Sequence, residues 1–325
     1  MKKFIILFFV LFSLVLICGM SCKKADDDPS NAGLISQFDS DKILVSTVVG
    51  STATGFGAVF ENLIIDSLAR VEFCRVYTDS IRYFEDLSGY FFTQDFFGWN
   101  VAYPTNKDLE GTYLWDLQDP EGNFFIRTMS EIAKTEGSGF IEYYWNNPAT
   151  GDNEKKLSFI HAIPGIEYYI GSGFYIRSTD PTITLLESNK EISKNATISF
   201  AEGIAAVFVD IYTDSLNRVQ FCRTLLDTIK YFEDNSGYFF VVDLNGYCIS
   251  HGANKNLEGT DVYDLQDSKG VFFIREMIAL AENPGYGFFE YYWNNPASGL
   301  DEKKMTYILL IPGTDYFIGA GIYVQ

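Results

Sequence analysis

The stretch Glu142-Tyr143-Tyr144-Trp145-Asn146-Asn147-Pro148-Ala149 occurs twice in this chain and returns unchanged as residues 290–297. The same offset of 148 residues relates the segment from about Gly55 to Tyr175 to the segment from Gly203 to Tyr323, without a gap. A unit of about 150 residues is long enough to bury its own core, unlike the short units of a solenoid. The sequence therefore predicts two homologous domains in tandem, and we expect each to fold independently.

Each repeat begins with a helical pattern and continues with strand signals. Apolar residues follow a helical spacing through residues 34–83 and 183–231. In the second repeat, strands are predicted at 238–242, 247–250, 287–293, 304–311 and 316–323, with a helix over 272–281. We expect an α+β fold in which a long N-terminal helix precedes an antiparallel sheet flanked by helices, with those helices packed on one side.

The start of the chain resembles a bacterial lipoprotein signal. A basic Met1-Lys2-Lys3 precedes apolar residues 4–17, and Ser21 stands just before Cys22, the expected lipidated residue. Residues 22–33 then form a charged tether. We expect a signal peptide over 1–21, a first domain over 34–178 and a second over 181–325. An uncleaved N-terminal anchor is the alternative.

Composition narrows the classes of partner and chemistry. The formal net charge of −19 argues against nucleic acid or anionic lipid as a partner. The two histidines, His161 and His251, are not equivalent between the repeats, which gives little support to a histidine-based triad. The cysteines lack the spacing of a zinc site. We therefore expect neither catalysis nor a bound metal or cofactor.

The second repeat carries a series of short motifs in a fixed order. They are Ser236-Gly237-Tyr238-Phe239-Phe240, Gly246-x-x-x-Ser250-His251, Leu257-Glu258-Gly259, Asp264-Leu265-x-Asp267-x-x-Gly270, Phe273-Ile274-Arg275-Glu276, Gly287-Phe288-x-Glu290-Tyr291-x-Trp293, Lys304-x-x-Tyr307 and Ile318-Gly319-x-Gly321-x-Tyr323. With this series the repeat resembles the extracytoplasmic single Cache domains of bacterial sensors. The resemblance implies a PAS-like fold with a small-ligand pocket on the face of the sheet. Similar domains bind small carboxylates or other small metabolites.

The candidate ligand-binding residues follow from that resemblance and from the needs of a carboxylate, which binds best to a cation or to several donors. The set is His251, Lys304 and Tyr307 in the second repeat, where the first repeat has Tyr103, Lys156 and Phe159. Lys156 is thus the one member that the first repeat keeps, and we predict that the second repeat is the binding one. An exposed lysine and a hydrogen-bonded surface histidine are the alternatives.

Aromatic residues of one strand complete the candidate site. Tyr292 and Trp293 are proposed as pocket walls. Alternate residues of a strand face opposite sides, so Trp293 shares a face with Tyr291 while Tyr292 shares one with Glu290. The sequence does not say which face lines the pocket, and core packing is the alternative for these rings.

These features predict a non-catalytic, lipid-anchored, extracytoplasmic protein that binds a small organic acid or similar metabolite as a sensor or for solute capture. No second apolar span and no signalling domain follows before Gln325, so we expect any output to pass through a partner signalling or transport protein. The alternative is a structural or adhesive lipoprotein of the cell envelope that keeps the Cache fold without a functional pocket.

Overall fold

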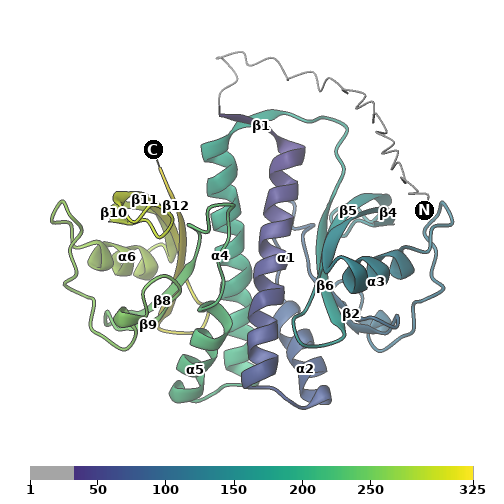
Figure 1. The fold of residues 1–325 in the computed structure, drawn as a ribbon, viewed down its shortest axis with the longest axis horizontal. Helices are drawn as coiled ribbons and strands as arrows, with labels where there is room; N and C mark the ends of the chain where they lie inside the picture. Colours follow the sequence, from purple (N-terminus) through teal and green to yellow (C-terminus); the bar gives the residue numbers. More distant parts are fainter. Residues whose placement is uncertain (1–32, 325) are drawn as a thin grey trace, which may run out of the picture. The chain divides into compact units, whose positions relative to one another are not determined.

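The computed structural model describes residues 33–324; the predicted signal peptide and Cys22 lie outside the described residues. From Leu34 onward the two repeats form one unit (Figure 1). The first repeat contains β1 (Leu34–Ser36), α1 (Gln37–Asn62), α2 (Ser67–Thr78), β2 (Phe92–Asp95), β3 (Asn100–Ala102), η2 (Lys107–Leu109), α3 (Phe125–Thr135), β4 (Ser138–Asn146), β5 (Asn153–Ala162) and β6 (Tyr168–Tyr175). The second contains β7 (Thr182–Thr184), α4 (Leu185–Asp210), α5 (Ser215–Leu226), β8 (Phe239–Asp243), β9 (Cys248–His251), η3 (Lys255–Leu257), α6 (Phe273–Glu282), β10 (Tyr286–Asn294), β11 (Asp301–Leu310) and β12 (Tyr316–Tyr323).

The predicted strands and the helix between them are confirmed to within a few residues, whereas the N-terminal helical segment is divided. Two helices replace the one that we expected, because an aspartate caps the second helix in each repeat. The Asp66 side chain accepts from the backbone amides of Leu68 and Ala69, and Asp214 accepts from Asn217. Such caps satisfy amides that a new helix would otherwise leave without a partner.

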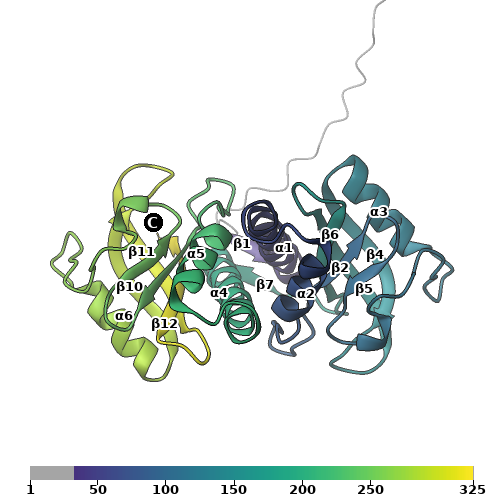
Figure 2. The same ribbon diagram turned by 90° about the horizontal axis from the view of Figure 1, so that it is seen from below.

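Each repeat builds a five-stranded antiparallel sheet, ordered β3-β2-β6-β5-β4 in the first and β10-β11-β12-β8-β9 in the second. Helices cover both faces of each sheet, which corrects the expectation of helices on one side (Figure 2). The strands bury residues of both faces: Phe317 packs in the cluster with α6, and its neighbour Ile318 packs in the cluster with α4 and α5. One face of each sheet therefore packs on the long helices. The other lies under α6 in the second repeat and under α3 in the first, and the candidate site is on that second face.

The two repeats meet through equivalent residues. Ile35 of β1 pairs with Ile183 of β7, and the Ser40 and Ser188 hydroxyls are 2.7 Å apart. Phe73 likewise faces its equivalent, Phe221, with ring centroids 5.9 Å apart. Contacts between residues offset by 148 are the signature of a two-fold, self-complementary interface. The chain therefore folds as a symmetric dimer would, with both halves on one polypeptide.

One hydrophobic cluster runs through this interface and includes residues of both repeats. Part of it is α1, which is long and apolar enough to span a membrane, yet 67% of its apolar window is buried inside the unit. We interpret α1 as a core helix. Independent folding of the repeats stays a prediction, and the shared cluster means that a separated repeat would expose this face to water.

Candidate functional site

Lys304 lies on β11 of the second sheet, between Tyr291 of β10 and Tyr323 of β12. Its side chain is fully buried, and Nζ is 3.7 Å from the centroid of the Tyr238 ring and 5.2 Å from that of Tyr323. No acceptor among residues 33–324 hydrogen-bonds to Nζ. Burial, with a contribution from the nearby charge of Lys230, places the pKa of Lys304 well below its usual value.

The ring beneath Lys304 carries a second unsatisfied group. The Tyr238 hydroxyl is buried, and within the described part of the chain it has no hydrogen-bond partner. A buried ammonium without a counter-charge and a buried hydroxyl without a partner each raise the free energy of the folded protein. An acceptor within reach of both Lys304 and Tyr238 would satisfy the two groups at once.

His251, at the end of β9, contributes a neutral donor. Its Nδ1 accepts from the backbone amides of Ala253 and Asn254, at 3.3 and 2.9 Å, so the neutral ring carries its proton on Nε2. Burial and then the charge of Lys304 lower the pKa of His251 to about 3. The imidazole thus stays uncharged near neutral pH, and its centroid lies 5.2 Å from that of Tyr238.

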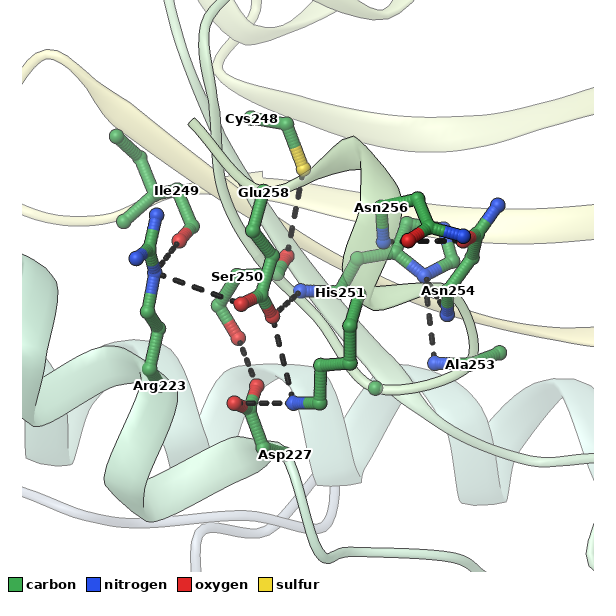
Figure 3. A network of polar contacts seen from close by, with 12 residues as sticks. Arg223, Asp227, Cys248, Ile249, Ser250, His251, Ala253, Asn254, Asn256 and Glu258 are labelled. Atoms are coloured by element: carbon green, nitrogen blue, oxygen red, sulfur yellow. Dashed lines mark hydrogen bonds and ion pairs between the residues drawn. The ribbon is translucent and has the colours of Figure 1, made fainter. Parts of the chain in front are cut away.

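A network of polar contacts fixes the loop that orients His251 (Figure 3). Glu258 accepts from the backbone amide of His251 at 2.9 Å and forms ion pairs with Arg223 and Lys255. Lys255 also pairs with Asp227, the residue that follows α5. The first repeat builds the same network, in which Glu110 holds the Tyr103 amide and pairs with Arg75 and Lys107. The backbone at this position is therefore held alike in both repeats, and the side chain is what differs.

A narrow cavity opens beside His251, between the sheet and α6. Its walls include Phe240, His251, Phe273, Tyr291 and Trp293. The cavity volume is about 20 Å³, which is room for about one water molecule. Only a very small ligand can enter this space unless the surrounding side chains move.

Two of the residues proposed from sequence lie elsewhere. Tyr307 is three positions from Lys304 and so faces the other side of β11, where it packs on Phe288 with centroids 4.9 Å apart. Tyr292 points away from the cavity, with the Lys269 ammonium 4.7 Å from its ring. The structure brings His251, Lys304 and Trp293 to one side of the sheet and separates them from Tyr307 and Tyr292.

Sequence reasoning missed Tyr238 and Tyr323, which enclose the lysine. Both tyrosines are present in each repeat, as Tyr90 and Tyr175 in the first. The signal that could have found Tyr238 is its strand alternation with Phe240, a cavity residue, since residues two apart share a face.

The first repeat contains the same lysine in a different surrounding. Lys156 is fully buried and, within residues 33–324, has no hydrogen-bond partner; its Nζ is 3.9 Å from the Tyr90 centroid. Burial lowers the pKa of Lys156 as well. Tyr103 stands where the second repeat has His251, and its hydroxyl is 2.9 Å from that of Tyr90. The adjoining cavity has a volume of about 10 Å³.

Across residues 33–324, no group of three or more His, Cys, Asp or Glu side chains is placed to hold a metal ion.

Comparison with known proteins identifies related sequences for both repeats. A family model described as Cache domain matches residues 76–203 and 204–325. The sensor histidine kinase MctS of Rhizobium johnstonii is 33% identical over 111 residues, which are 34% of this chain and 23% of that protein. The methyl-accepting chemotaxis protein McpP of Pseudomonas putida is 34% identical over 92 residues, 28% of this chain and 17% of that protein. Each match therefore spans less than a quarter of the curated relative.

A solved structure also resembles part of the chain. It was reported for carboxylic acid recognition by a Cache chemosensory domain, and it is 26% identical with a TM-score of 0.33. The alignment covers 41% of this chain and 86% of that one.

Proposed function

This chain belongs to the Cache domain family, and on that premise we propose that its second repeat binds the carboxylate of a small organic acid at Lys304. The observation that carries the proposal is the fully buried Lys304 amine, which has no acceptor among residues 33–324. A buried charge without a partner is costly, and a sheet interior gains nothing from it that an apolar side chain would not supply. A bound carboxylate would be its counter-charge.

The neighbouring groups have complementary roles in this proposal. Lys304 supplies the charge, while the Tyr238 hydroxyl and the Nε2 proton of His251 are the available donors. Phe240, Phe273 and Trp293 would cover the apolar end of the acid. Because a carboxylate next to Nζ favours the charged amine, binding would raise the pKa of Lys304 toward its usual range.

The relatives point to a sensory role. One is named a sensor histidine kinase and the other a methyl-accepting chemotaxis protein, although each match covers a small share of their length. We propose that this chain works outside the cytoplasm, reports ligand binding through a partner signalling or transport protein, and has no catalytic activity of its own.

The test is calorimetric titration of the full mature chain with acetate, propionate and pyruvate, comparing Lys304→Met with Lys303→Met. Lys303 is the adjacent residue, half-exposed and paired with Glu290, and so provides a matched control. We expect Lys304→Met to weaken binding to the second repeat about ten- to a hundredfold, the value of one hydrogen bond to a charged group. Lys303→Met should bind as the parent does. Unchanged binding by Lys304→Met would refute the proposed site.

We also propose that Cys22 carries the lipid anchor, on the strength of the preceding signal-like sequence. In cells, Cys22→Ser should accumulate as an unprocessed precursor or leave the membrane fraction, as measured by fractionation and labelling with a radioactive fatty acid. Cys248→Ser, a change at a buried cysteine, is the matched control. Continued lipid labelling of Cys22→Ser would contradict this assignment.

A further inference from the structure

A cleft between the two repeats lies at the end of the helix pair where α1 and α4 begin. Its walls come from α1, from the loop at residues 84–86, from α4, and from the segment that joins the repeats, which passes this end of the helices (Figure 1). The cleft has a volume of about 420 Å³, against about 20 Å³ for the cavity beside His251. This volume is within the range of small-molecule sites, so the cleft can hold a ligand without rearrangement.

Hydrogen bonds hold the walls of the cleft together. The backbone amide of Gln37 donates to the Pro181 carbonyl at 2.8 Å, which ties the joining segment to the start of α1. The backbone amide of Phe84 donates to Oδ1 of Asn195 at 3.3 Å, which ties a loop of the first repeat to α4 of the second. Because the walls are already tied, a ligand would bind with little ordering cost.

Asp41 of α1 is a buried carboxylate in this cleft. Its residue is 2% exposed, and it lines both this cleft and an adjoining cavity of about 160 Å³. Gln37 donates to Oδ1 and Arg177 to Oδ2, each at 2.8 Å. An ionised carboxylate can accept about four hydrogen bonds, so these two bonds leave capacity for donors in the cleft.

The counter-charge of Asp41 is incomplete. The Arg177 side chain is 48% exposed, so water screens its attraction to the carboxylate. Burial raises the pKa of Asp41, and the contacts with Gln37 and Arg177 oppose this rise without cancelling it. A second cation next to Asp41 would therefore stabilise the ionised carboxylate.

The rest of the lining adds to the negative charge. Within residues 33–324, the cleft is lined by one guanidinium, that of Arg177, and by four carboxylates, those of Asp41, Glu85, Asp86 and Glu191. A cleft lined mostly by charges of one sign concentrates ligands of the opposite sign. The expected ligand is therefore a cation.

The second repeat shows that the fold does not require all of these acids. Asn189 stands at the position equivalent to Asp41, and Ile43 stands at the position equivalent to Glu191. A buried carboxylate raises the free energy of the folded protein unless it is paired, and an asparagine would avoid that cost. Two of the carboxylates thus occur on one side of the interface only, where a bound cation would give them a counter-charge.

The arrangement of the carboxylates decides the kind of cation. Across the described residues, no three acidic side chains lie close enough together to hold a metal ion. Carboxylates spread around a cleft suit a molecule with separated positive groups, and Leu44, Phe84 and Pro181 provide apolar surface between them. We propose that this cleft binds a small aliphatic amine, and that a diamine binds more tightly than a monoamine because each ammonium group can meet a carboxylate. The site and the ligand class differ from those at Lys304, so the inference does not rest on the proposed function.

The experiment is calorimetric titration of the full mature chain with 1,4-diaminobutane and with its matched monoamine, 1-aminobutane. We expect one diamine site whose affinity is at least tenfold above that for the monoamine, because the second ammonium gains a charge-assisted hydrogen bond. Asp41→Asn, which copies Asn189 of the other half, should weaken diamine binding about ten- to a hundredfold. Unchanged binding by Asp41→Asn would overturn the inference.

A matched pair of surface variants separates the cleft from net charge. Glu85→Gln should weaken diamine binding about two- to fivefold, as expected for an exposed charge. Glu233→Gln removes the same charge at the equivalent position of the second repeat and should bind as the parent does. Equal losses in the two variants would show that the diamine responds to net charge, and would also overturn the inference.

Lys304→Met distinguishes this site from the carboxylate site. It should bind the diamine as the parent does, and loss of diamine binding in this variant would place the amine elsewhere than in the cleft. A parent that binds small acids and not the diamine would overturn this inference and leave the proposed function standing. A parent that binds the diamine and no small acid would have the opposite consequence.

Discussion

The two repeats keep the same buried lysine but surround it differently. In the second, the Tyr238 hydroxyl has no partner among the described residues and a neutral His251 stands beside it. In the first, the equivalent Tyr90 hydroxyl is already paired with Tyr103. The backbone networks that hold these positions are alike, as the ion pairs of Glu110 and Glu258 show. The comparison teaches that both repeats keep the scaffold and the buried lysine, while the polar groups around the lysine differ.

The largest expected effect comes from removing either lysine. An unpaired buried charge replaced by an apolar group of similar volume should stabilise the ligand-free protein, by about 1–4 kcal/mol. We therefore expect Lys304→Met and Lys156→Met each to raise the urea midpoint, and Lys303→Met, on the exposed side, to leave it almost unchanged. If the two lysine variants are destabilised instead, the charges have partners in the folded protein and the ligand site proposed at Lys304 loses its main support.

The interface provides a second test, because its symmetry is imperfect. A Cβ on Gly203 of α4 would lie 2.4 Å from the Tyr77 ring, while a Cβ on the equivalent Gly55 of α1 would lie 2.8 Å from Leu225. Gly203→Ala should therefore cost roughly 1–3 kcal/mol as an overpacked core change. Gly55→Ala should have a similar cost, because its Cβ would also meet the Leu225 backbone carbonyl oxygen at 2.8 Å, and a backbone atom cannot move aside as the end of a side chain can.

Chemical denaturation of both variants measures the two costs. Gly57→Ala is the control within one repeat, as its Cβ would meet Pro164 of the same domain at 2.9 Å. A much smaller cost at Gly55 than at Gly203 would mean that the Leu225 backbone moves aside more readily than the Tyr77 ring.

The histidine predicts a pH dependence that the first repeat lacks. The pKa of His251 falls from 6.5 to about 3 on folding, so between these values the unfolded chain binds a proton that the folded chain does not. Stability is then fully present above 6.5 and is lost as the pH falls toward 3, by about 1.4 kcal/mol per pH unit.

His251→Tyr, which copies the first repeat, should remove this contribution. Urea unfolding of parent and variant across that pH window gives the difference in slope, with the other acidic groups common to both proteins. His161→Tyr is the control, as His161 lies in the first repeat outside the cavity. Parallel slopes for parent and His251→Tyr would show that His251 titrates alike in the folded and unfolded chains.

Much of the fold could be predicted from the sequence, and the site only in part. Strand periodicity and the repeated motifs were sufficient to locate the sheet, and comparison of the copies selected Lys304 and His251, whose binding role stays a prediction. Tyr307 was misplaced because its spacing to Lys304 was interpreted as a motif, although three residues along a strand place two side chains on opposite faces. The pairing of Ser40 with Ser188 could not be predicted, because it depends on how two helices far apart in sequence pack together.

The smallest and most specific test compares the two tyrosines that the lysines cover. Tyr238→Phe removes a buried hydroxyl that has no partner within residues 33–324, so it should leave stability unchanged or raise it slightly. Tyr90→Phe removes one member of a hydroxyl pair and leaves Tyr103 unsatisfied, which should cost about 1 kcal/mol. Denaturation curves of the two variants should therefore shift in different directions or by clearly different amounts. In ligand titrations Tyr238→Phe should weaken binding in the second repeat, about three- to tenfold for one neutral hydrogen bond. A loss of stability in Tyr238→Phe as large as that in Tyr90→Phe would mean that the Tyr238 hydroxyl has a partner in the folded protein, and would remove it from the carboxylate site.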